Sequence, residues 1–168
     1  MTLNAQYCIY KPNFVDSTKG HASQWEWADK LGAFFITVAK QLPDKKDGHN
    51  VFNWKENSVK MKLGITELAD IMLVLEGKKD FLGKPEEAKP DGEPRSKFKK
   101  GMGLFHKTES SSSVFKIYKI DDEGFGFDIS RLVGEKFWGG HRISLAEAKV
   151  LHTIFQFVIN EMFKLGKV

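Results

Sequence analysis

The chain has 168 residues, of which 41% are hydrophobic and 29% charged, enough for one globular domain, residues 1–168, with a hydrophobic core. Its 26 Lys and Arg against 22 Asp and Glu give a formal charge of +4, which permits an anionic partner without requiring one. A single cysteine excludes an internal disulfide and a multi-cysteine metal site. No apolar run approaches the roughly 20 residues of a membrane span, so we expect neither a membrane segment nor a secretion signal.

The first half of the chain is predicted to form four strands and a helix. The strands are expected at residues 7–15, 25–27, 33–40 and 50–63, the last broken near Asn57. A polar loop is expected at 16–24 and a turn at 43–48. Lys60 and Lys62 lie on one side of the fourth strand. After Gly64 the apolar spacing becomes helical, with Thr66 as the expected N-cap.

The second half repeats this order after a proline-rich segment. Residues 83–97 hold three of the five prolines and are expected to form a long mobile loop. Strands are then expected at 102–107, 114–120, 125–130 and 138–143, with a turn at 121–124. A final helix is capped by Ser144 and Glu147, runs to about Lys164 and stops near Gly166. The pattern therefore predicts an α+β fold with an internal repeat of four strands and a helix.

No cluster of catalytic or metal-binding residues is apparent in the sequence. The five histidines are scattered, without a pair at metal-ligand spacing. The acidic run at 121–123 coincides with a predicted turn and reads as solvated. We therefore expect a protein that is not an enzyme and has no metal or cofactor.

Cations and aromatic residues alternate in several segments, at 10–14, 95–101, 105–107 and 115–119. On a strand, Lys116 and Tyr118 share one face while Phe115 and Ile117 share the other. A face that presents rings and cations suits a single-stranded nucleic acid, whose bases stack on rings and whose phosphates attract lysines. The alternative is a sheet with a solvated lysine face.

The last helix has a broad apolar face that one sheet covers only in part. The rest of this face is expected to pack against the first helix or against a second copy of the chain. The residues proposed for contact between copies are Leu151, Phe155, Val158 and Met162.

Five short segments, in order along nearly the whole chain, resemble the Whirly single-stranded-DNA-binding proteins. They are residues 7–11 (YCIYK), 52–63 (FNWKENSVKMKL), 64–68 (GITEL), 104–107 (LFHK) and 143–147 (ISLAE). The resemblance extends more distantly to the trypanosomal mitochondrial guide-RNA-binding proteins and the positive-cofactor-four coactivators. One element differs, because residues 11–15 (KPNFV) stand where Whirly proteins carry a Lys-Gly-Lys-Ala-Ala-Leu element tied to higher-order assembly.

The resemblance implies two four-stranded antiparallel sheets packed crosswise with two helices, and a homotetramer that binds single-stranded DNA along its sheets. It implies a role in DNA replication, recombination, repair or transcription. The expected location is the cytoplasm for a protein of bacterial or phage origin, and otherwise an organelle or the nucleus. The positions expected to contact the strand are Tyr10, Lys11, Trp54, Lys60, Lys62, Phe105, Lys107, Lys116, Tyr118 and Lys119. Composition alone adds Phe98, Lys99 and Lys100.

Three other functions remain open from the sequence. An RNA-binding or annealing protein on the same fold would use the same rings and cations. A protein-interaction domain would show no salt-dependent affinity for nucleic acid. A nuclease would need a carboxylate cluster or a histidine pair, which the sequence does not show.

Overall fold

The computed structural model describes residues 6–87, 90–91 and 98–166. The first sheet contains β1 (Gln6–Lys11), β2 (His21–Ala28), β3 (Ala33–Lys46), β4 (His49–Phe52) and β5 (Ser58–Leu63). Strands β1, β2, β3 and β5 are antiparallel neighbours in that order, and β4 extends the sheet by pairing with the far end of β3.

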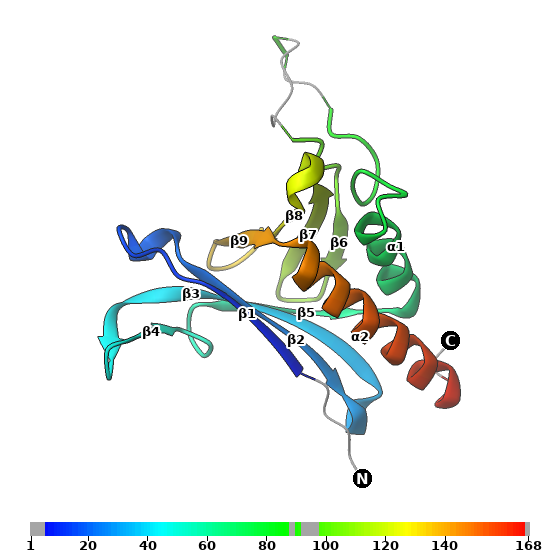
Figure 1. Cartoon of the computed structure of the whole chain (residues 1–168), viewed down its shortest axis with the longest axis horizontal. Coiled ribbons are helices and arrows are strands. Elements are labelled where there is room, and N and C mark those ends of the chain that lie inside the picture. Colours follow the sequence, from blue (N-terminus) through cyan, green and yellow to red (C-terminus); the bar gives the residue numbers. More distant parts are fainter. Residues whose placement is uncertain (1–5, 88–89, 92–97, 167–168) are drawn as a thin grey trace.

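The second sheet contains β6 (Leu104–Lys107), β7 (Ser112–Lys119), β8 (Phe125–Arg131) and β9 (Phe137–Ile143), antiparallel and in chain order. The helices are α1 (Ile65–Leu75) and α2 (Leu145–Lys164), and short 3-10 turns occupy Ser17–Lys19, Asp29–Leu31 and Asp121–Glu123. Figure 1 shows the two sheets crossing, with both helices lying to one side of the first sheet. The predicted α+β fold with doubled sheets and helices is confirmed.

Several boundaries differ from the prediction. The strand expected at 50–63 is split into β4 and β5 by a turn at 53–57. The turn expected at 43–48 is a hairpin, because Asp47 and Gly48 both adopt left-handed conformations (φ 51° and 79°) and reverse the chain in two residues. Residues 21–24, expected in a loop, belong to β2, where they pair with both β1 and β3.

The two helix starts show how capping is satisfied. Gly64, not Thr66, is the N-cap of α1, and the Glu67 carboxylate accepts a hydrogen bond from the Gly64 amide at 2.7 Å. The predicted capping box of α2 is confirmed, with Ser144 accepting from the Glu147 amide and Glu147 accepting from the Ser144 amide. The predicted loop at 83–97 lies partly outside the described residues, at 88–89 and 92–97.

The core forms where the inner faces of both sheets meet α2. Trp25 of β2 is fully buried, and its ring centroid lies 6.2 Å from that of Phe115, 5.5 Å from Phe127 and 5.8 Å from Phe155. Phe155 also meets Phe34 at 5.4 Å, edge to face. Phe155 of α2 therefore packs against Phe34 and Trp25 of the first sheet, and Trp25 in turn packs against the second sheet.

This packing corrects the prediction about contact between copies of the chain. Leu151, Phe155, Val158 and Met162 are at most 3% exposed, because the first sheet and α1 already cover them within the chain. The exposed apolar side chains of α2 are others, including Leu145 at 60% and Phe163 at 58%. Among the described residues, no helix has the length and apolar character that a membrane crossing requires.

Candidate functional site

The outer face of the first sheet presents rings beside cations. Strand register places Phe35 next to Lys62 and Thr37 next to Lys60, on the face that points away from α2. Lys60 Nζ lies 4.3 Å from the centroid of the Phe35 ring and 3.6 Å from the Glu26 carboxylate. We call this surface the first outer face, made of Tyr10, Phe35, Trp54, Lys60 and Lys62.

Small residues create a hollow in the first outer face that aromatic side chains occupy. Ala22 and Ala39 sit side by side on β2 and β3, and Phe52 and Trp54 pack over them. Tyr10 stands beside Phe52, with ring centroids 5.6 Å apart, and stays 55% exposed. Tyr10 therefore offers a free ring surface that is held in place by its neighbours.

The outer face of the second sheet carries a comparable set. Phe105 of β6 and Trp138 of β9 lie in one register row, separated by β7 and β8, and are 59% and 53% exposed. Lys116, Tyr118 and Arg142 lie on the same face in the neighbouring rows. We call these five residues the second outer face.

The segment before β6 covers part of the second outer face. Glu86 forms an ion pair with Lys116. The Phe98 ring stacks on Tyr118, with centroids 6.0 Å apart and planes 25° from parallel. Lys100 reaches the Asp128 carboxylate at 3.2 Å and lies 5.0 Å from the centre of the Tyr118 ring. Tyr118 is in consequence only 7% exposed.

This covering changes the ionisation of two groups. Burial raises the pKa of the Tyr118 hydroxyl above its usual value, against the influence of nearby Lys100. Burial opposes the charge of Lys100, but Asp128 and Tyr118 outweigh it, so the pKa of Lys100 is raised. Lys100 therefore stays cationic and fixed beside the aromatic pair.

Two predicted contact residues point the other way. Lys11 follows Tyr10 on β1 and so faces α2, where its Nζ lies 2.7 Å from the Glu147 carboxylate. Lys119 follows Tyr118 on β7 and lies on the inner side of the second sheet, opposite Phe125. Strand alternation excludes both from the outer faces.

Two further predicted residues are exposed. Lys107 is exposed at the end of β6, and Lys99 is exposed with Asp80 at 3.6 Å. Phe35, Trp138 and Arg142 complete the two faces but were not predicted. Alternation alone would have found them, since Phe35 lies in the strand predicted at 33–40, opposite Lys62, and Trp138, Gly140 and Arg142 share one side of β9.

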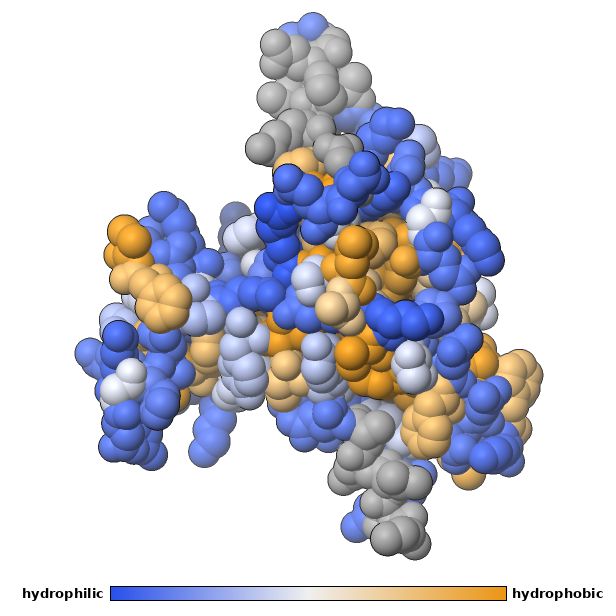
Figure 2. Space-filling model, in the orientation of Figure 1, coloured by the Kyte–Doolittle hydropathy of each residue, from blue (hydrophilic) through white to orange (hydrophobic). Residues whose placement is uncertain are grey.

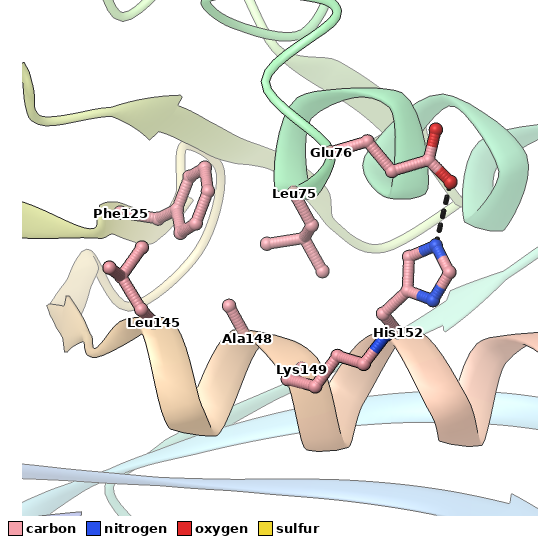
Figure 3. Close-up of a pocket in the computed structure, with 7 residues that line it drawn as sticks. All are labelled: Leu75, Glu76, Phe125, Leu145, Ala148, Lys149 and His152. Carbon is pink, nitrogen blue, oxygen red and sulfur yellow. Dashed lines mark hydrogen bonds and ion pairs between the residues drawn. The ribbon is translucent and has the colours of Figure 1, made fainter. Parts of the chain in front are cut away.

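A separate pocket of about 330 Å³ lies between the two helices (Figure 3). Leu75, Phe125 and Leu145 form its apolar part, and at one end His152 meets Glu76 at 2.7 Å. Figure 2 shows hydrophobic side chains gathered in this part of the molecule, within a largely hydrophilic face. The pocket lining also includes Lys149, and the residues that line it contain no Ser, Thr or Cys nucleophile beside a base.

Metal ligands do not converge either. Within residues 6–87, 90–91 and 98–166, no group of three His, Cys, Asp or Glu side chains is placed to hold an ion. The two outer faces are thus the parts of the described chain with the most distinctive chemistry, namely exposed rings next to cations.

Comparison with known proteins shows the fold and does not show a sequence family. No protein-family model and no curated protein sequence matches this chain. Solved structures do match over most of its length. The plant transcriptional regulator PBF-2 is 16% identical with a TM-score of 0.61, covering 99% of this chain and 86% of that one.

Two further structures show the same likeness. WHY1 from Arabidopsis thaliana is 16% identical, with a TM-score of 0.60 and coverage of 95% of this chain and 90% of that one. A guide-RNA-binding protein complex bound to a guide RNA is 12% identical, with a TM-score of 0.60 and coverage of 94% and 91%. The chain has the fold of the Whirly and guide-RNA-binding proteins, as the sequence resemblance predicted.

Proposed function

We propose that this chain binds single-stranded nucleic acid, with single-stranded DNA as its main ligand, and has no catalytic activity. The observation that carries the proposal is the pair of outer faces, each with exposed rings beside cations. Stacking of bases on such rings contributes roughly 1–3 kcal/mol per base, with little preference for sequence. Each phosphate that a lysine neutralises adds binding free energy, and this contribution decreases as the salt concentration rises.

The first outer face is the better developed binding surface. Its Lys60 and Lys62 are exposed, and its Tyr10 ring is more than half free. On the second outer face, Lys116 and Tyr118 are engaged by Glu86 and Phe98. A single-stranded nucleic acid therefore binds first along the outer face of β1, β2, β3 and β5 and then contacts Phe105 and Trp138 on the second sheet.

The solved structures of this fold support the proposal, because one of them is a protein complex bound to a guide RNA. That likeness also makes RNA the second candidate ligand. We further propose that several copies assemble, with a tetramer favoured, and that the protein acts in replication, recombination, repair or transcription. Exposed Leu145, Val150 and Phe163 on α2 supply apolar surface for such assembly.

The test is fluorescence-polarisation binding to a labelled strand of about 30 nucleotides, beside the matching RNA and the duplex, across a salt series. We expect tight binding to the DNA strand, with log affinity falling linearly in log salt by about 0.7 per phosphate contacted. Absence of binding at low salt would overturn the proposal, and tighter binding to RNA would reverse the order of the ligands.

A matched pair of variants locates the site. Lys62→Ala removes an exposed cation from the first outer face, whereas Lys149→Ala removes an exposed cation from α2, on the other side of that sheet. Both lower the net charge by one. We expect Lys62→Ala to reduce the salt slope by about 0.7 and Lys149→Ala to leave it unchanged. Equal effects would show that only net charge matters.

A further inference from the structure

A shallow pocket of about 400 Å³ lies on the second outer face, where β8 and β9 meet the segment that leads to β6. It falls in the size range of pockets that hold small organic groups, about 300–1,000 Å³. The residues that line it and that the argument uses are Phe98, Tyr118, Glu123, Gly126, Trp138, Gly140 and Arg142.

Glycines shape the inner end of this pocket. Gly126 and Gly140 occupy the outward positions on β8 and β9. A Cβ on Gly126 would lie 2.6 Å from the Tyr118 ring, which therefore lies over that glycine, and one on Gly140 would lie 2.2 Å from the Phe127 carbonyl oxygen. Glycine at position 126 thus lets the Tyr118 ring lie against β8, and glycine at position 140 leaves the pocket without a side chain between Trp138 and Arg142.

The walls of the pocket are aromatic. Trp138 is 53% exposed and is held edge-on by His21, with ring centroids 5.6 Å apart and planes at 89°. The Tyr118 ring forms another wall and is fixed by the stacked Phe98. A flat heteroaromatic group between such rings gains stacking on its faces, and a purine presents more area for it than a pyrimidine.

The rim adds a donor and an acceptor. Arg142 and Glu123 form an ion pair with side chains 58% and 69% exposed, so separating them costs little. The Arg142 guanidinium offers a planar fork of N–H donors that matches the O6 and N7 acceptors of guanine. The Glu123 carboxylate can accept from ring and exocyclic N–H groups of a base.

We propose that this pocket binds one purine base of the single strand, stacked against Trp138 and met at its edge by Arg142 and Glu123. The inference rests on the proposed function and deepens it. A binding surface that otherwise tolerates any base sequence then prefers a purine at one position on each chain.

The test compares two labelled strands of about 15 nucleotides, an oligothymidylate with one central guanosine and the same strand with an abasic site there. We expect wild-type protein to bind the guanosine strand at least about fivefold more tightly, from stacking alone. Trp138→Ala should abolish this difference, and Trp138→Phe should retain part of it. Arg142→Ala should lower the preference for guanosine over an adenosine strand.

Phe105→Ala is the matched control, because Phe105 is equally exposed in the same register row on the far edge of the sheet. It should weaken binding to both strands by a similar factor and leave their ratio intact. Far-ultraviolet circular dichroism and thermal unfolding verify that each variant is folded. Equal wild-type affinity for the guanosine and abasic strands would overturn the pocket while leaving the proposed function standing. No binding to either strand would overturn both.

Discussion

Acidification is expected to destabilise this protein well above the pH at which carboxylates titrate, and His141 is the reason. Burial at the junction of the two sheets lowers the pKa of His141 from 6.5 to about 4, although the neighbouring Arg142 carbonyl and Glu147 favour its charge. Its Nδ1–H donates to the Arg142 carbonyl oxygen at 2.8 Å, so Nε2 is unprotonated and accepts from the Ser23 hydroxyl at 2.8 Å. Ser23 in turn accepts from the Trp25 indole at 3.0 Å.

The sign and size of the effect follow from these pKa values. The folded pKa is below the unfolded one, so the unfolded chain binds more protons between pH 6.5 and about 4, and stability falls as pH falls through this window. At pH 5 the unfolded histidine is almost fully protonated and the folded one about one-tenth protonated, a free-energy difference of about 2 kcal/mol. Burial also lowers the pKa of His21, which adds in the same direction.

Urea unfolding at about pH 7.5 and pH 5 measures this contribution. We expect wild type to lose at least about 2 kcal/mol between the two, and His141→Gln to lose about 2 kcal/mol less than wild type does. His49→Gln, at an exposed histidine of β4, is the control and should keep the full pH dependence. Burial opposes the charge of Glu147, but Lys11 and Ser144 outweigh it and lower the pKa of this carboxyl from 4.5, so the stability that it contributes is lost as pH falls below about 4.5, outside the comparison of pH 7.5 with pH 5. A His141→Gln variant with the wild-type pH dependence would refute the reasoning.

Three further outcomes are expected. Phe155→Ala should cost about 3–5 kcal/mol in urea unfolding, since this fully buried ring meets both Trp25 and Phe34; a cost below about 1 kcal/mol would contradict the described core. Gly140→Ala should cost about 1–3 kcal/mol, because its Cβ would meet the backbone of β8, and an unchanged melting temperature would contradict that geometry. Glu86→Gln frees Lys116 and should steepen the salt dependence of strand binding by about 0.7, which an unchanged slope would exclude.

Much of the fold could be predicted because its signals are local. The Ser144 and Glu147 capping box fixes the start of α2 within a few residues, and the change from alternating to helical spacing around Gly64 marks the passage from β5 to α1. The turn predicted at 43–48 includes Asp47 and Gly48, which reverse the chain, but it began too early, because β3 continues through Pro43 to Lys46. The strand boundaries depend on pairing with a partner strand, which no local pattern reveals.

The candidate site was less predictable, for two physical reasons. Adjacent residues on a strand face opposite ways, so a segment such as 10–11 contributes its tyrosine to one surface and its lysine to another. An interpretation based on composition assigns both the tyrosine and the lysine to a single site. Exposure also depends on distant segments, since Tyr118 is on the predicted face but is covered by Phe98, twenty positions earlier in the chain.

The contacts that cover Lys116 and Tyr118 give the two outer faces different binding chemistry. On the first outer face the cations Lys60 and Lys62 are exposed, and Lys60 keeps a 52% exposed side chain although Glu26 lies 3.6 Å away. On the second face the side chains of Lys116 and Lys100, paired with Glu86 and Asp128, are only 22% and 23% exposed. Phosphate attraction therefore belongs mainly to the first face. The second face keeps exposed rings, which favour contact with bases. Salt should accordingly weaken contacts on the first sheet more than those on the second, so base preference at Trp138 should persist as overall affinity falls with salt.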